Sequence, residues 1–151
     1  MTVTMSKTGL GSALAAATRR VHGSIQEVVA AQGLAVDQWS VLDKIAGSAG
    51  AASMSEIAEA TGLTGPSLTR AVDKLVTAAL VFREIDARDR RKVLVDLSKR
   101  GHLVHADLAP RVYSTERELL TEPDSSLAEL LRVLEGMSSA QSPTEAVAGS
   151  E

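Results

Sequence analysis

Residues 53–101 decide the fold of this chain and read SMSEIAEATGLTGPSLTRAVDKLVTAALVFREIDARDRRKVLVDLSKRG. The stretch opens on Ser53 and Glu56, which have the S-x-x-E spacing of a capping box. In a capping box each side chain bonds the backbone amide of the other residue, so the pattern predicts a short helix over residues 54–61. Gly62 is expected to end this helix, because glycine readily adopts the left-handed conformation that follows a last helical turn.

A second helix is predicted over residues 66–79, because Pro66 fits a first helical turn, where its missing amide is not needed. Helical spacing predicts an inward face made by Leu68, Ala71, Val72 and Leu75. The opposite polar face could be plain solvated surface or could enter the major groove of DNA, where arginine reads guanine and hydroxyls hold phosphates. Its place directly before a basic hairpin favours DNA contact by Ser67, Thr69, Arg70 and Lys74.

Two short β-rich runs follow, over residues 81–85 and 92–97. In the second run Val93, Val95 and Leu97 alternate with other side chains, which predicts one buried face. Between the runs lies a charged tip that could be only a solvated loop. After the helix pair, a thin basic tip favours minor-groove contact, where the negative potential attracts guanidinium groups; its candidates are Arg88, Arg90, Arg91 and Lys92.

Outside this stretch, apolar spacing predicts helices over residues 12–31, 36–46 and 102–121 and a further helix after residue 123. Pro110 is expected to interrupt and kink the third of these helices. The fold class is therefore mainly α with a small β-hairpin wing, arranged as a winged helix-turn-helix. We expect a flexible N-terminus over residues 1–11, one domain over 12–135 with the winged helix-turn-helix at 36–98, and a flexible tail over 136–151.

Composition narrows the function. The chain has 151 residues and a net charge of -3, yet residues 64–102 carry nine bases and five acids, so this basic middle can bind a polyanion. The absence of cysteine excludes disulfides and thiolate metal sites. No apolar run is long enough for a membrane span or a signal peptide, so a soluble cytoplasmic protein with no membrane partner is expected.

The sequence resembles the MarR family of transcriptional regulators. Asp89-Arg90-Arg91 followed by Leu97-Ser98-Lys99-Arg100-Gly101 matches the family's wing signature D-x-R, five residues, L-[TS]-x-x-G. Leu68 to Leu75 with Ala79-Leu80-Val81 resembles the family's recognition helix and its exit, and Ser53 to Gly62 resembles the preceding helix. The resemblance is firm over residues 34–101, and the outer helices support it by their order. Ser98 stands where threonine is commoner in the family.

This resemblance implies a homodimer that binds double-stranded DNA. In the family the terminal helices of two chains interlock, and here these dimerisation helices are residues 12–31 and 99–135. A dimer would read a pseudo-palindrome with half-sites about one helical turn apart. By the motif, Arg91 enters the minor groove and Asp89 orients it through a salt bridge, although Asp89 could merely keep the tip soluble.

The resemblance also implies a small-molecule effector, for example a phenolic or other organic anion, bound between the dimer helices and the DNA-binding lobe. Its candidate pocket residues are His22, Trp39 and Tyr113. For Trp39 the favoured interpretation is an ordinary core residue rather than one that stacks on a ligand, and Tyr113 has the same two interpretations.

No cofactor, no metal and no enzymatic activity are predicted. The chain lacks a Gly-rich phosphate loop and a nucleophile-elbow motif. His102 and His105 lie three residues apart and could share Asp107 as a partner, but ordinary exposed or hydrogen-bonded histidines are the favoured interpretation. The alternative function is a winged-helix module for protein–protein contact without DNA, which the basic tip disfavours.

Overall fold

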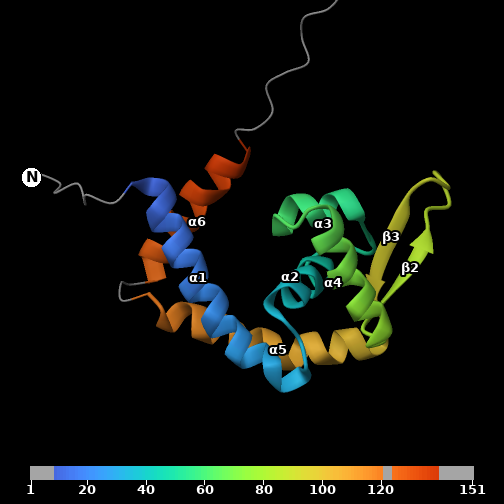
Figure 1. The fold of residues 1–151 in the computed structure, drawn as a ribbon, viewed down its shortest axis with the longest axis horizontal. Helices are drawn as coiled ribbons and strands as arrows, with labels where there is room; N and C mark the ends of the chain where they lie inside the picture. Colours follow the sequence, from blue (N-terminus) through green and yellow to red (C-terminus); the bar gives the residue numbers. More distant parts are fainter. Residues whose placement is uncertain (1–8, 121–123, 140–151) are drawn as a thin grey trace, which may run out of the picture. The chain divides into compact units, whose positions relative to one another are not determined.

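The computed structural model describes residues 9–120 and 124–139 (Figure 1). The chain divides into two compact units, Met1–Glu116 and Arg117–Glu151. The first unit holds the core and the winged helix-turn-helix, and the second contains the helix α6 (Asp124–Ser139). No helix in the described ranges has the length and apolar character needed to cross a membrane.

The first unit is mostly helical with a small three-stranded sheet, which confirms the predicted fold class. Its elements in chain order are α1 (Leu10–Val29), the 3-10 turn η1 (Ala30–Gln32), α2 (Val36–Ala46), β1 (Ala52–Ser53), α3 (Met54–Thr61), α4 (Gly65–Thr77), β2 (Val81–Ile85), β3 (Val93–Leu97) and α5 (Lys99–Glu118).

The capping box at the start of α3 is confirmed. The Ser53 amide donates to the Glu56 carboxylate at 2.7 Å, and the Glu56 amide donates to the Ser53 hydroxyl at 3.2 Å. These bonds favour the ionised carboxylate and so lower the pKa of Glu56 below its usual value. Gly62 ends the helix with a φ of 71°, the left-handed conformation expected of it.

The strand β1 was not predicted. Ala52 pairs with Val95 and Ser53 pairs with Leu94, so that β3 lies in the centre of the order β1-β3-β2. The sequence reads as a Gly/Ala/Ser-rich connection here, because two bridging residues are too short to show a strand period. The predicted hairpin is confirmed, with Val81 opposite Leu97 and Ile85 opposite Val93.

The core lies between α2, α3, α4, the sheet and the middle of α5. Its largest fully buried side chains come from all of these elements: Leu42, Ile45, Ile57, Val72, Leu75, Val95, Leu108 and Val112. The helix α1 adds only Ile25 and Val29 to the buried set. Within the described part of the first unit, most other α1 side chains are exposed or only partly buried.

The helices differ from the sequence expectations in three places. The helix α1 begins at Leu10, inside the segment expected to be flexible, and α6 continues to Ser139, inside the expected tail. The helix α5 begins at Lys99, where the predicted dimerisation segment begins, and passes through Pro110 without the expected interruption. A proline removes one amide from a helix, and Leu108, Ala109 and Val112, buried on either side of Pro110, hold the helix in place.

Candidate nucleic-acid interface

The helix α4 presents one buried and one exposed face. It begins after Thr64 with Gly65 at a φ of 47° and Pro66 in the first turn, which lets the chain leave the turn at a sharp angle. As predicted, its buried residues are Leu68, Ala71, Val72 and Leu75. The four predicted DNA-contacting side chains of this helix are all exposed.

These four side chains differ in what they can offer a ligand. The Thr69 hydroxyl donates to the Gly65 carbonyl at 3.2 Å, so its lone pairs and methyl group face outward. Neither Arg70 nor Lys74 takes part in any salt bridge among the described residues. Their positive charges are therefore unneutralised within this part of the chain.

An ion pair ties α4 to the wing. The guanidinium of Arg83 on β2 binds the carboxylate of Asp73 on α4. In the sequence these two residues lie ten positions apart within the basic stretch of residues 64–102. Because the contact joins α4 to β2, it helps to hold the wing in a defined orientation beside the exposed face of α4.

The wing tip is built by two aspartates that accept bonds from the backbone. The Asp86 carboxylate accepts from the Arg88 amide at 2.8 Å, and the Asp89 carboxylate accepts from the Arg91 amide at 3.1 Å. The Lys92 amide also donates to the Asp89 carbonyl at 2.9 Å. These bonds close the turn and leave the cationic side chains outside it; Arg88, Arg90, Arg91 and Lys92 are all exposed.

The contact expected between Asp89 and Arg91 is present but loose. The Arg91 Nε lies 3.9 Å from the Asp89 carboxylate, and the Arg91 side chain is 97% exposed. An exposed ion pair at this distance contributes little, because water and salt screen it. The firmer role of Asp89 is to shape the turn through the Arg91 amide.

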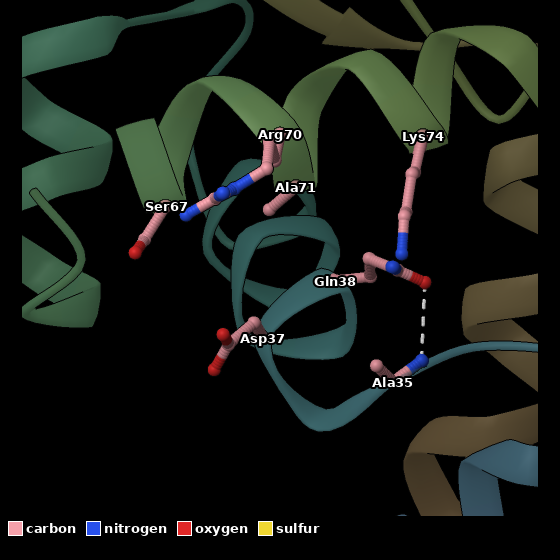
Figure 2. A pocket seen from close by; sticks show the side chains of 7 residues that line it. All are labelled: Ala35, Asp37, Gln38, Ser67, Arg70, Ala71 and Lys74. Atoms are coloured by element: carbon pink, nitrogen blue, oxygen red, sulfur yellow. Dashed lines mark hydrogen bonds between the residues drawn. The ribbon is translucent and has the colours of Figure 1, made fainter. Parts of the chain in front are cut away.

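A cavity of about 180 Å³ lies between the start of α2 and the recognition helix (Figure 2). Ser67, Arg70 and Lys74 reach it from α4, and Asp37 and Gln38 reach it from α2. The three α4 residues were predicted from the sequence, and the two from α2 were not. Their position at the second and third residues of a helix that starts beside a cationic helix would have been the available signal.

A second cluster joins α2 to α5. The Asp43 carboxylate accepts from the Tyr113 hydroxyl at 2.6 Å and lies 2.8 Å from the His105 Nε2. The His105 ring stacks on Trp39, with centroids 5.3 Å apart and planes 7° apart. We call Trp39, Asp43, His105 and Tyr113 the α2–α5 clasp. Asp43 also lines a cavity of about 330 Å³ with residues of α2 and α3.

The clasp contains two of the three predicted pocket residues. Trp39 is 3% exposed, so its interaction is with the core and the His105 ring. His22 is exposed on α1 and takes no part in the clasp contacts that the structure describes. Asp43 and His105 were missed as pocket residues, although Asp43 follows Trp39 by one helical turn and therefore shares its face.

The carboxylate of Asp43 affects the pKa values of neighbouring groups. The bond to Asp43 raises the pKa of Tyr113 to about 12. Burial and the Asp43 charge raise the pKa of Glu116 above its usual range. Within the described residues, no group of three or more His, Cys, Asp or Glu side chains is arranged to hold a metal ion.

The Tyr113 bond predicts an alkaline titration. Tyr113 is the sole tyrosine of the chain, so tyrosinate absorbance reports this residue alone. We expect a midpoint near 12, and a midpoint shifted toward 10 in Asp43→Asn, where the charge is gone. A raised pKa means that stability from this bond is complete below pH 10 and lost as the pH rises through 12.

Helical circular dichroism on the same samples separates this titration from alkaline unfolding. A wild-type midpoint close to 10, with the helices intact, would contradict the bond between Tyr113 and Asp43.

Comparison with known proteins gives one family. The MarR family model matches residues 32–92, which run from the end of η1 to the wing tip. A MarR-family transcriptional regulator from Rhodococcus sp. RHA1 has a TM-score of 0.79 at 24% identity, covering 88% of this chain and 96% of that one. CouR from Rhodococcus jostii RHA1, bound to p-coumaroyl-CoA, has a TM-score of 0.80 at 24% identity, covering 93% and 100%.

A further solved structure is a mutant of MarR from E. coli complexed with operator DNA. Its TM-score is 0.73 at 23% identity, and the match covers 85% of this chain and 92% of that one. These solved structures share the fold of this chain, and the family model covers the helix-turn-helix with the strand β2 and the wing tip. The chain therefore has the winged helix-turn-helix fold of solved MarR-family regulators, and its residues 32–92 are similar to the MarR family model.

Proposed function

We propose that this chain is a sequence-specific DNA-binding repressor that acts as a homodimer on a pseudo-palindromic operator and is released by a small molecule. The observation that carries the proposal is the pairing of two exposed cationic elements, the α4 face with Arg70 and Lys74 and the wing tip with Arg91, tied by the Asp73–Arg83 ion pair. A helix of this polarity fits the major groove, and a basic hairpin beside it fits the adjacent minor groove.

Exposed apolar side chains support the dimer. Leu10 of α1 is 63% exposed and Leu103 of α5 is 73% exposed, although both lie on helices. In the second unit, α6 leaves a further set exposed: Leu130, Leu131, Val133 and Met137. Apolar surface of this kind is stabilised by burial, and a second copy of the chain is the partner that the family resemblance suggests.

The direct test is binding to a random-sequence duplex at low salt. We expect binding that weakens steeply as salt is added, because several phosphates release counterions when cationic side chains contact them. Selection of bound fragments from genomic DNA should then yield a palindrome, and loss of the protein should raise transcription from that site. A monomer that ignores every duplex in dilute buffer would favour the protein–protein module instead.

The α2–α5 clasp is the place where we expect an effector to act. It links α5 to α2, and α2 packs directly on the recognition helix α4, so a ligand that opens the clasp would alter the position of α4. Solved structures of similar fold include CouR bound to p-coumaroyl-CoA and NadR in complex with 4-hydroxyphenylacetate. Another is BpsR, whose DNA binding is regulated by 6-hydroxynicotinic acid. Because Asp43 is acidic, we expect the effector here to bring an aromatic ring and a hydrogen-bond donor.

Trp39 is the sole tryptophan and stacks on His105, so its fluorescence reports the clasp. Aromatic amines, phenols and aromatic acids should be titrated against the protein and against its DNA complex. A compound that changes Trp39 emission should also release the duplex. If every such compound leaves the complex intact, the effector part of the proposal is wrong while DNA binding stands.

A further inference from the structure

We infer that the cavity between α2 and α4 is a seat for one phosphodiester group of the duplex backbone, and that Gln38 is a DNA-positioning residue that holds it together with Lys74. The inference rests on the DNA binding proposed above and adds the binding of one anionic phosphate at a defined place. We call Gln38, Lys74 and the cavity between them the phosphate seat.

The first support is the state of the Gln38 amide. Gln38 is only 7% exposed, and its oxygen accepts from the Ala35 amide at 3.0 Å. That bond settles the orientation of the amide, because only the oxygen can accept from an N–H group. The nitrogen is thereby turned toward the cavity, and among the described residues it donates no hydrogen bond to the protein. No buried side-chain nitrogen or oxygen among the described residues lacks a partner, so the Gln38 nitrogen is open to solvent at the cavity, where a ligand oxygen can reach it.

The second support is the neighbour of that nitrogen. Figure 2 shows the Lys74 side chain reaching from α4 toward the Gln38 amide, and both residues line the cavity. The Lys74 ammonium and the Gln38 amide nitrogen are both donors, so these two nitrogens cannot bond each other. One acceptor at the cavity can bond both of them, and the positive charge of Lys74 favours an anionic acceptor.

The surrounding charge agrees with an anion on the DNA-facing side. The seat lies at the first turn of α2, an 11-residue helix whose N-terminal end carries partial positive charge. Arg70 stands on the Ser67 side of the same cavity, and Asp37 is the one carboxylate that lines it. The cavity of about 180 Å³ opens beside the exposed face of α4, so a backbone phosphate can reach it while that face meets the bases.

The phosphate seat implies that different side chains of α4 contact the DNA backbone and the bases. If Lys74 and Gln38 hold a phosphate, they fix the register of α4 on the duplex and carry no sequence information. The remaining exposed side chains, Ser67, Thr69 and Arg70, are then free to meet base edges. Lys74→Gln should weaken binding by a similar factor for all sequences and lower the salt slope by about one.

Gln38→Glu is the decisive variant. The glutamate oxygen can still accept from the Ala35 amide, so the local turn is kept while the donor becomes a negative acceptor. We expect duplex affinity to fall roughly tenfold, on random DNA and on a selected operator alike. Gln38→Met removes the donor without adding charge and should cost a factor of about three.

Two matched controls separate the seat from general charge effects. Gln32→Glu makes the same chemical change on η1, where the side chain bonds Asp107, and should stay within about twofold of the wild type. Asp37→Asn removes the carboxylate at the rim of the cavity and should strengthen binding by about twofold. Thermal unfolding of each variant confirms that it is folded.

Inorganic phosphate distinguishes the source of the anion. The side-chain amide resonance of Gln38 should shift when duplex is added, and free phosphate should move it only weakly. If the wild type binds duplex but Gln38→Glu binds as tightly as Gln32→Glu, the seat is wrong and DNA binding stands. A full response to free phosphate without any effect of Gln38→Glu on duplex binding overturns it too. If the wild type binds no duplex, both proposals fall.

Discussion

Gly101→Ala should lower the free energy of unfolding by about 3 kcal/mol and the melting temperature by roughly 10 °C, measured by thermal circular dichroism. A Cβ on Gly101 would collide with the carbonyl of Leu80 and touch the Leu97 side chain at 3.4 Å. The Leu80 carbonyl cannot move freely, because it accepts from the Ser98 amide at 3.0 Å. The clash is therefore with a fixed backbone group rather than with a flexible side chain.

The contacts between the exit of α4 and the start of α5 explain why Ser98 and Gly101 occur three residues apart in the wing signature. The Ser98 hydroxyl accepts from the Gly101 amide at 3.0 Å and donates to the Ala79 carbonyl at 2.6 Å. Ser98 thus caps α5 and bonds the exit of α4, and Gly101 lets α5 approach that exit closely. The glycine of the wing signature is required by this crossing.

Gly23→Ala is the matched control for Gly101→Ala. Gly23 lies within α1, and a Cβ there would meet nothing within 4 Å. Alanine should stabilise the helix by about 0.5–1 kcal/mol, since it restricts the unfolded chain. Opposite signs at the two glycines are expected, and an unaffected melting temperature in Gly101→Ala would disprove the close approach of α5 to Leu80.

Arg91→Ala should weaken operator binding by about 1–3 kcal/mol, a loss of roughly ten- to a hundredfold, with helical content unchanged. The side chain is 97% exposed, and its amide is held by Asp89, so the guanidinium is presented outward on a closed turn. Fluorescence anisotropy on a selected operator measures the loss. Unchanged affinity would remove Arg91 from the wing's DNA-contacting residues.

Two variants sharpen this result. Arg20→Ala removes the same charge from an exposed position on α1 and should change the affinity by about twofold or less. Asp89→Asn retains an oxygen for the Arg91 amide but removes the weak ion pair, so it should bind DNA about as well as the wild type. A large loss in Asp89→Asn would instead favour orientation of Arg91 by the salt bridge.

The predicted DNA-contacting residues illustrate how far local patterns reach. The exposed face of α4 follows from the spacing of Leu68, Ala71, Val72 and Leu75, because burying those four turns the remaining side chains outward. In β3 the predicted buried face is confirmed for Val95 and Leu97, but it is wrong for Val93, which is 39% exposed beside the wing tip. That the exposed residues of α4 and the wing tip contact DNA stays a proposal, which the duplex experiments above address.

The effector residues show the opposite case. Trp39 and Tyr113 were named from the family resemblance, and His22 was named with them. The clasp brings Tyr113 to Trp39 only through Asp43 and His105, which are 62 residues apart in the chain. No local pattern in a single sequence indicates which polar side chains meet across such a separation. For the same reason, the sequence could not show that His22 lies outside the clasp.

The sequence alone determines the order of the helices, the capped α3, the amphipathic α4 and the basic hairpin. Local patterns suffice for these features, because caps, turns and residue periods act between near neighbours in the chain. Packing of distant segments decided the rest: the strand β1, the uninterrupted α5, the Asp73–Arg83 tie, the clasp on Asp43 and the open donor of Gln38. Those features depend on which surfaces meet in three dimensions, since a hydrogen-bond partner or a close backbone crossing exists only once both segments are in place.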